Sequence, residues 1–193
     1  MEKWQVSHSD LVLNNKWAKV RRDTCVTATG NKVEDYYYWE GGDFAQVFAL
    51  TDDGRVLLVR QYKHGVKEVV LELPAGLVSA GDDDSPLATA RRELLEETGF
   101  EAREWRDLGR LNVSSAKATT RAYPFLATNT QRVGEPKLDE NEDIEVALVK
   151  IPDLLDLIST GAVRDSNSIA CCLLALRVLY PDITWVGSPR VAP

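Results

Sequence analysis

Four charged residues near the middle of the chain have the types and the spacing needed to bind a cation. Arg92, Glu93, Glu96 and Glu97 lie in one short segment, RELLEETGF. Residues three and four positions apart share a helix face, so these carboxylates would repel one another. Mg²⁺ prefers oxygen ligands and binds through one or two carboxylates together with substrate phosphates. The spacing alone leaves two interpretations open, a solvated acidic helix face and a magnesium site.

The residues around this segment predict the helix that carries it. Ser85 has the chemistry of an N-cap, and Pro86 suits the first helical position. The acidic residues 82–84 suit the positive end of the helix dipole, and Gly99 is a typical helix stop. Upstream, residues 74–76 form a Pro-Ala-Gly turn of the kind in which backbone approaches a ligand.

The whole pattern resembles the box of the Nudix hydrolases. That box reads Gly, five residues, Glu, seven residues, and then Arg-Glu-U-x-Glu-Glu-x-Gly-U, where U is apolar. Its second half is complete at residues 92–100. The first half departs, because Asp82 replaces the glutamate and nine residues separate it from Arg92. The resemblance implies an α/β (α+β) fold, the Nudix α/β/α sandwich. A mixed sheet would carry the box helix on one side and the C-terminal helix on the other.

Two further segments resemble the branch of the family that cleaves ADP-ribose and other nucleoside diphosphate sugars. One is Arg-Gln-Tyr-Lys at residues 60–63, just upstream of Glu-Leu-Pro-Ala-Gly, with Lys63 where arginine is commoner. The other is the acidic segment 140–144. By this resemblance Glu140 takes the position of the general base and Glu142 that of an additional metal ligand. Which of the two glutamates plays which part stays open.

The resemblance implies hydrolysis of a diphosphate bond to give a nucleoside monophosphate and a sugar phosphate, with Mg²⁺ or Mn²⁺. The implied catalytic residues are Glu140, Glu97, Glu96 and Arg92, and the implied metal ligands are Ala75 (carbonyl), Glu93, Glu96, Glu97 and Glu142. Candidate phosphate-binding residues are Arg60, Lys63 and Arg121, and candidate base-stacking residues are Tyr36, Tyr38 and Trp39. A strand packed on both faces, or an interface, is the alternative interpretation, and we favour it for any single one of these aromatic residues. The alternative functions are a non-catalytic nucleotide sensor and a dinucleoside polyphosphate hydrolase.

Composition excludes several other classes of protein. The net charge is −7, and the pI of about 5.0 argues against nonspecific binding to nucleic acid or anionic membranes. The chain has no apolar run of membrane-spanning length, and its N-terminus lacks a signal-peptide core. Three cysteines and two histidines support neither a disulfide framework nor a histidine-based zinc site. We therefore expect a reducing, cytoplasmic location.

Hydrophobic periodicity predicts the remaining elements. Residues 1–15 are expected to form a loose arm. Strands are expected over 16–27, 33–40, 44–50, 55–61, 101–111, 123–127 and 144–151, with Pro124 marking an edge or a bulge. Helices are expected over 152–159 and after residues 165–166, the last as core packing without chemistry, and the tail after Pro181 is expected to be ordered only in part. We divide the chain into N-terminal strands, residues 1–42, which would serve dimerisation and the nucleotide site, and a Nudix hydrolase domain, residues 43–193, and we expect a homodimer.

Overall fold

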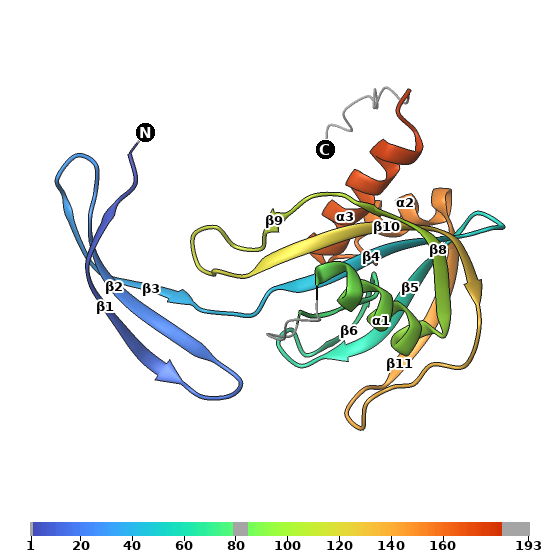
Figure 1. The fold of residues 1–193 in the computed structure, drawn as a ribbon, viewed down its shortest axis with the longest axis horizontal. Helices are drawn as coiled ribbons and strands as arrows, with labels where there is room; N and C mark the ends of the chain where they lie inside the picture. The colour runs from blue at the N-terminus through green and yellow to red at the C-terminus, as the bar shows by residue number, and fades with distance from the viewer. Residues whose placement is uncertain (1, 79–84, 183–193) are drawn as a thin grey trace.

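The structure is a computed structural model that describes residues 2–78 and 85–182 (Figure 1). Its strands are β1 (Gln5–Asn14), β2 (Lys19–Val26), β3 (Lys32–Trp39), β4 (Phe44–Thr51), β5 (Arg55–Lys63), β6 (Glu68–Glu72), β7 (Ala75–Leu77), β8 (Phe100–Asp107), β9 (Leu111–Asn112), β10 (Arg121–Arg132) and β11 (Ile144–Lys150). Its helices are α1 (Pro86–Thr98), α2 (Ile151–Ser159) and α3 (Ser166–Leu179). The predictions made for residues 82–84 and for the tail beyond residue 182 lie outside the described residues.

The N-terminal residues form a separate antiparallel sheet, in the order β1-β2-β3, that projects away from the rest of the molecule (Figure 1). The expectation of a loose arm over residues 1–15 is therefore wrong, because β1 pairs with β2 from Gln5 to Asn14. Nearly every residue of β1 is exposed, so the strand lacks the alternating burial that marks a strand in a sequence. Main-chain pairing holds this strand in place, and main-chain pairing leaves little trace in residue type.

The second sheet is mixed and has the strand order β11-β5-β4-β10-β8, with β6, β7 and β9 attached to β5, β4 and β10. Strand β10 runs parallel to β4 and antiparallel to β8. Strands β4 and β5 form a hairpin but pair only at Leu50 and Val56, so they diverge away from their turn. The gap between β4 and β5 therefore widens like a wedge away from their turn, and different helices pack on the two faces of the sheet.

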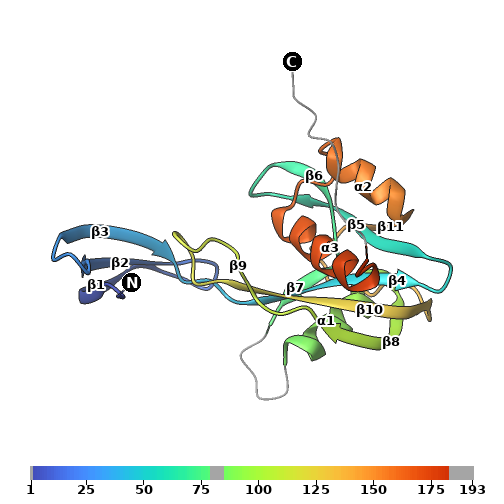
Figure 2. The ribbon, with the colours of Figure 1, turned by 90° about the horizontal axis from the view of Figure 1, so that it is seen from above.

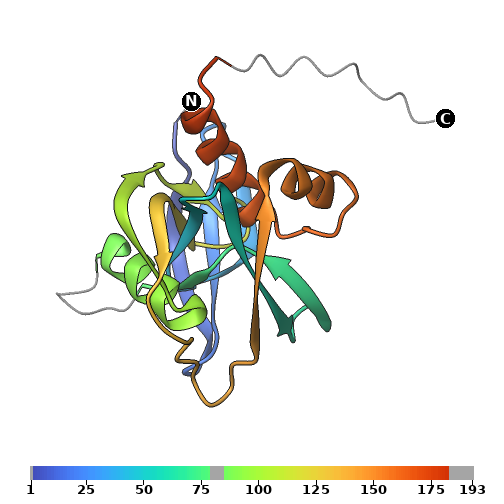
Figure 3. The same cartoon turned by 90° about the vertical axis from the view of Figure 1, so that its right-hand side faces the viewer.

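Two apolar clusters hold these layers together. Alternate residues of β4 point to opposite faces. Val47 packs with Leu94 of α1, whereas Phe48 packs with Leu176 of α3. Figures 2 and 3 show α1 on one side of the sheet and α2 and α3 on the other. This arrangement confirms the predicted α/β/α sandwich.

The predicted boundaries of the box helix are confirmed. The Ser85 hydroxyl accepts a hydrogen bond from the Ala88 amide (3.1 Å), and Pro86 occupies the first turn. Gly99 ends the helix at φ 73°, and its amide donates to the Leu95 carbonyl (2.8 Å). A left-handed residue at this point favours glycine, because a side chain would be strained there. Local sequence therefore suffices to define this helix.

Pro124 does not mark an edge strand, because β10 lies between β4 and β8. The antiparallel ladder with β8 begins one residue later, at Phe125 and Asp107. The Pro124 carbonyl still accepts a hydrogen bond from the Leu108 amide (3.0 Å). A central strand tolerates proline here because the ladder does not require an N–H at this position.

Candidate active site

Glu97, in the last turn of α1, is a buried carboxylate, only 3% exposed. Its Oε2 accepts a hydrogen bond from the Ala75 amide (3.1 Å). Ala75 and Gly76 begin strand β7, which pairs with β4, so the tight turn expected at residues 74–76 is wrong. Residues 73–76, which lead from β6 into β7, are called the 73–76 segment below. Burial, followed by repulsion from Glu93, raises the pKa of Glu97 from 4.5 to about 8. A buried carboxylate with such a pKa has too little positive charge around it. A cation bound at this point would supply that charge.

Glu93 lies one helical turn before Glu97 and packs against Gly76. A Cβ atom built on Gly76 would lie 1.9 Å from Glu93 Oε1, so only glycine leaves room for this carboxylate. Burial raises the pKa of Glu93, and the adjacent Arg92 opposes that shift. Strand β7 thus contacts two carboxylates of the box: the Ala75 amide binds Glu97, and Gly76, which has no side chain, leaves room for Glu93.

Arg92 joins two of the carboxylates. Its guanidinium lies 2.7 Å from Glu93 Oε1 and 2.7 Å from Glu96 Oε2. An arginine can bind two carboxylates at once because its donors form a planar fork. The Glu96 side chain is more exposed (40%) than that of Glu93 (13%), and Glu97 is buried.

The acidic segment of residues 140–143 lies in the loop between β10 and β11. The negative charge of Glu142 contributes to the raised pKa of both Glu93 and Glu97, which places it within electrostatic range of the box. Glu142 Oε2 accepts a hydrogen bond from the Asp139 amide (3.0 Å). Glu140 is exposed, and its side chain has no hydrogen bond or ion pair among the described residues. Of the two glutamates, Glu142 is the one that the loop brings into the electrostatic field of the box.

The chemistry of these residues fits a divalent cation, although their side chains do not already surround one. Within residues 2–78 and 85–182, no three acidic, histidine or cysteine side chains converge on a common point. Glu93 and Glu96 turn toward Arg92, and Glu142 turns toward the backbone of its own loop. All of the potential ligand atoms are nevertheless oxygens, which Mg²⁺ and Mn²⁺ prefer. Buried Glu97 also lacks a strong counter-charge, which a bound cation would supply.

The three candidate phosphate-binding residues lie in different surroundings. Lys63 Nζ is 3.0 Å from Glu72 Oε1, and its charge also lowers the pKa of Glu97, so it belongs to the site. Arg60 lies on the opposite face of β5, where its guanidinium is 4.0 Å from Glu145. Arg121 begins β10, and its amide donates to Asp43 Oδ1 (2.9 Å). Of these three residues, Lys63 is the one whose charge affects the pKa of a box carboxylate, Glu97.

The aromatic residues Tyr36, Tyr38 and Trp39 lie on β3, in the projecting sheet and far from α1 of the same chain (Figure 1). The Tyr36 hydroxyl donates to the Ala116 carbonyl (2.6 Å), and the Trp39 backbone pairs with the loop before β10. Burial and the nearby Asp23 raise the pKa of the Tyr38 hydroxyl. Trp39 remains 53% exposed. Within one chain, these rings do not meet the carboxylates.

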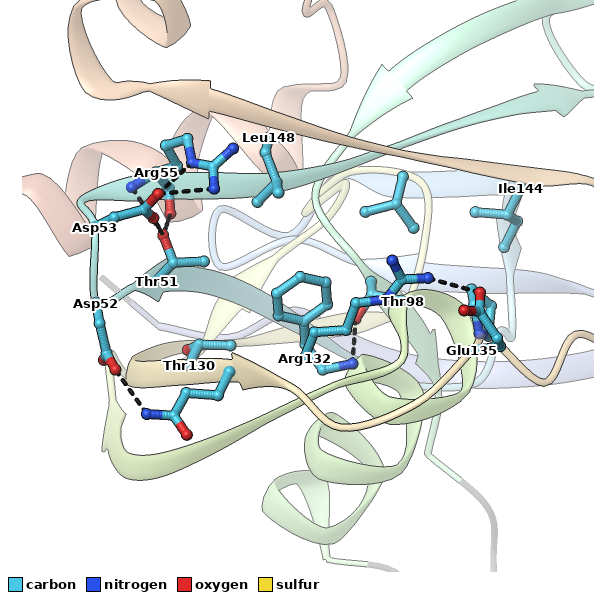
Figure 4. A pocket seen from close by; sticks show the side chains of 14 residues that line it. Thr51, Asp52, Asp53, Arg55, Thr98, Thr130, Arg132, Glu135, Ile144 and Leu148 are labelled. Atoms are coloured by element: carbon cyan, nitrogen blue, oxygen red, sulfur yellow. Dashed lines mark hydrogen bonds and ion pairs between the residues drawn. The ribbon is translucent and has the colours of Figure 1, made fainter.

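A cavity of about 680 Å³ lies at the other end of the wedge, by the turn between β4 and β5 (Figure 4). Its floor is apolar and includes Ile144 and Leu148, and ion pairs such as Arg132 with Glu135 form its rim. None of the box glutamates lines it. The carboxylates of α1, and not the residues of this cavity, therefore have the chemistry of a cation site.

Sequence reasoning missed several polar residues that support the site. Gln46 donates to the Ser168 hydroxyl (2.9 Å) in the core between β4 and α3. Glu72 accepts a hydrogen bond from Gln61 (2.9 Å) and forms an ion pair with Lys63 (3.0 Å). One signal was visible, because Gln46 interrupts the otherwise apolar run Phe-Ala-Gln-Val-Phe-Ala-Leu. A polar residue in a strand that reads as fully buried calls for a hydrogen-bonding partner.

The fold and the site define an α+β protein with a cluster of carboxylates on the helix α1 that packs against its mixed sheet. The sequence profile of the NUDIX domain matches residues 44–170, more than half of the chain. The profile of the nucleoside diphosphate sugar hydrolase N-terminal domain matches residues 4–39. The chain belongs to the Nudix family, which confirms the family inferred from the box.

Characterised relatives and solved structures agree with this membership. The chain is 33% identical over 123 residues to the ADP-ribose pyrophosphatase of Bacillus subtilis, which covers 63% of this chain and 65% of the relative. It is 34% identical over 122 residues to the GDP-mannose pyrophosphatase of Citrobacter koseri, covering 59% and 62%. The alignment thus spans slightly less than two thirds of each relative. The crystal structure titled "ADP compounds hydrolase" has the same fold, with a TM-score of 0.81, 18% identity and coverage of 94% of this chain and 96% of that chain.

In the described residues, no helix is both long and apolar enough to cross a membrane.

Proposed function

We propose that this chain hydrolyses the diphosphate bond of ADP-ribose or a related nucleoside diphosphate sugar, using Mg²⁺ or Mn²⁺. The observation that carries the proposal is the buried Glu97, held by the Ala75 amide and surrounded by Glu93 and Glu142. The relatives named as ADP-ribose and GDP-mannose pyrophosphatases support this class of substrate. The products would be a nucleoside monophosphate and a sugar phosphate.

The proposed cation ligands are Glu93, Glu96, Glu97, Glu142 and the Ala75 carbonyl. Divalent cations held there would neutralise the diphosphate and lower the pKa of an attacking water molecule. Arg92 already bridges Glu93 and Glu96, so it would orient these two carboxylates while they hold a cation. Glu142 is the better candidate for a ligand because its charge raises the pKa of Glu93 and Glu97. The exposed Glu140 would then act as the general base and accept the proton of the attacking water.

Substrate binding would begin at Lys63. Its ammonium group lies at the edge of the box, where it can contact a phosphate oxygen while Glu72 holds the other side of the same group. Arg60 and Arg121 are exposed and free to reach a longer substrate, so we keep them as secondary contacts. A lysine is a compact charge without a fixed fork, so it would bind phosphate with less orientational demand than arginine.

We further propose that the chain acts as a homodimer in the cytoplasm. The projecting sheet exposes large apolar side chains, among them Trp4, Val6, Val12, Trp17 and Trp39. Such surfaces on a soluble domain are typical of protein interfaces. A second copy seated there would bring Tyr36, Tyr38 or Trp39 of one chain toward the box of the other. The three cysteines are free thiols, which suits a reducing compartment.

Release of monophosphate from a substrate panel tests the reaction. The panel contains ADP-ribose, GDP-mannose, ADP-glucose, UDP-glucose, diadenosine tetraphosphate and nucleoside triphosphates, each with Mg²⁺, Mn²⁺ or a chelator. We expect cation-dependent cleavage of the diphosphate sugars to a nucleoside monophosphate and a sugar phosphate. Cleavage confined to diadenosine tetraphosphate would replace the substrate class. Tight binding of ADP-ribose without any cleavage would make the chain a sensor.

A further inference from the structure

The first turn of helix α3 contacts the 73–76 segment, which lies beside the box helix. Ser168, the third residue of α3, is fully buried at 0% exposure. Asp165 caps the helix, and its Oδ2 accepts a hydrogen bond from the Ser168 amide (2.7 Å). The Ser168 hydroxyl oxygen accepts two further bonds, from Gln46 Nε2 (2.9 Å) and from the Leu73 amide (3.0 Å). Helix α3, remote in sequence, therefore binds the backbone at Leu73, the first residue of the 73–76 segment.

These contacts continue to the box. The next residue, Pro74, accepts a hydrogen bond from the Val47 amide (2.9 Å). Ala75 then donates its amide to Glu97 (3.1 Å). The backbone of residues 73–75 is thus fixed by α3 at Leu73 and by β4 at Pro74, and it in turn fixes the carboxylate of Glu97.

Ser168 is a polar residue on the face of α3 that is otherwise buried in the apolar core. The neighbouring buried residues Cys171, Cys172, Ala175 and Leu176 fill an apolar core. A buried hydroxyl is tolerated there because it satisfies two buried donors. Without the Ser168 hydroxyl oxygen, the Leu73 amide would be left unpaired in the core, and the 73–76 segment would lose its hydrogen bond to α3.

We propose that Ser168 is a positioning residue for the cation site, acting through the Leu73 amide and the 73–76 segment on the Ala75–Glu97 contact. The inference rests on the proposed function, because it assumes that Glu97 binds the cation. Ser168 itself touches neither cation nor substrate. Its effect would resemble that of residues behind metal ligands elsewhere, whose loss weakens metal binding by about 10- to 100-fold.

The test compares Ser168→Ala with the wild-type chain by calorimetric titration of Mg²⁺ alone and by electron paramagnetic resonance of Mn²⁺. We expect about 10-fold weaker binding of both cations in Ser168→Ala. The Mg²⁺ concentration for half-maximal hydrolysis of ADP-ribose should rise by a similar factor, while KM at saturating Mg²⁺ stays within about twofold. Ser168→Thr keeps the hydroxyl and should restore cation affinity.

Cys172→Ala is the matched control, since Cys172 is buried in the same helix at 1% exposure but, among the described residues, no hydrogen bond joins it to the 73–76 segment. It should lower the melting temperature and leave cation affinity unchanged. Ser168→Cys, whose sulfur is a weaker acceptor, replaces Ser168→Ala if that variant does not fold. Wild-type cation affinity in the folded Ser168→Ala or Ser168→Cys variant overturns the inference, as does an equal loss in Cys172→Ala. If the wild-type chain itself neither binds Mg²⁺ nor cleaves any diphosphate, the proposed function fails as well.

Discussion

Replacing Glu97 with glutamine should stabilise the fold in alkaline solution while abolishing catalysis. The pKa of Glu97 rises from 4.5 in the unfolded chain to about 8 in the folded one, mainly because the carboxylate is buried. A raised pKa means that the folded chain holds the proton more tightly. The resulting stability is complete below pH 4.5 and is lost as the pH rises to about 8.

The size of this effect follows from linkage. Each pKa unit corresponds to about 1.4 kcal/mol, so the full shift would cost the folded wild-type chain up to about 5 kcal/mol above pH 8. Glutamine carries no charge and keeps an oxygen for the Ala75 amide, so Glu97→Gln avoids this cost. The stability of the variant relative to the wild type should therefore grow by about 3 to 5 kcal/mol between pH 5 and pH 8.5. For a chain of this size, that is a change on the order of 10 °C in melting temperature.

Thermal unfolding of both proteins with a chelator, at pH 5 and pH 8.5, measures this difference. Glu101→Gln, an exposed carboxylate outside the box, is the control and should show the same melting difference at both pH values. Excess Mg²⁺ at pH 8.5 should raise the melting temperature of the wild-type chain more than that of Glu97→Gln, because a cation offsets the buried charge. A melting difference that does not depend on pH would refute the argument from burial. Wild-type turnover in Glu97→Gln at saturating Mg²⁺ would remove Glu97 from the site.

Four other substitutions test separate parts of the site. Gly76→Ala should fold but displace the Glu93 carboxylate, because the new Cβ would lie 1.9 Å from Glu93 Oε1; we expect cation affinity, measured by Mg²⁺ titration, to fall about 10-fold or more. Lys63→Met should raise KM for ADP-ribose about 10-fold with a smaller change in kcat, and an unchanged KM would exclude Lys63 from phosphate binding. Glu140→Gln should remove the acidic limb of the pH dependence of kcat, whereas Glu142→Gln should raise the Mg²⁺ requirement; the reverse result would exchange their roles.

Much of the box was readable from local sequence. The cap at Ser85, the proline at Pro86 and the stop at Gly99 define α1 through contacts within a few residues of one another. The spacing of Glu93 and Glu97 then places both on one helix face. Such features are determined by nearest neighbours along the chain, and the structure confirms the predicted helix.

Other features depend on segments that are distant in sequence. The exposed strand β1 has no alternating pattern, so its pairing with β2 could not be read from residue type. Pro124 lies in a central strand because the ladder to β8 begins just after it, a matter of register between strands. The separation of the aromatic residues on β3 from the box likewise depends on how the two sheets are joined.

The sequence by itself determined the family, the box helix and the identity of the carboxylates, because these follow from residue type and short-range spacing. Only the tertiary structure decided that Glu97 is the buried one of the box carboxylates and that Arg92 bridges Glu93 and Glu96. It also decided that Ser168 binds the backbone of the 73–76 segment. Burial and hydrogen bonds between remote residues arise when helix and sheet pack together. Neither leaves a periodic signal along the chain.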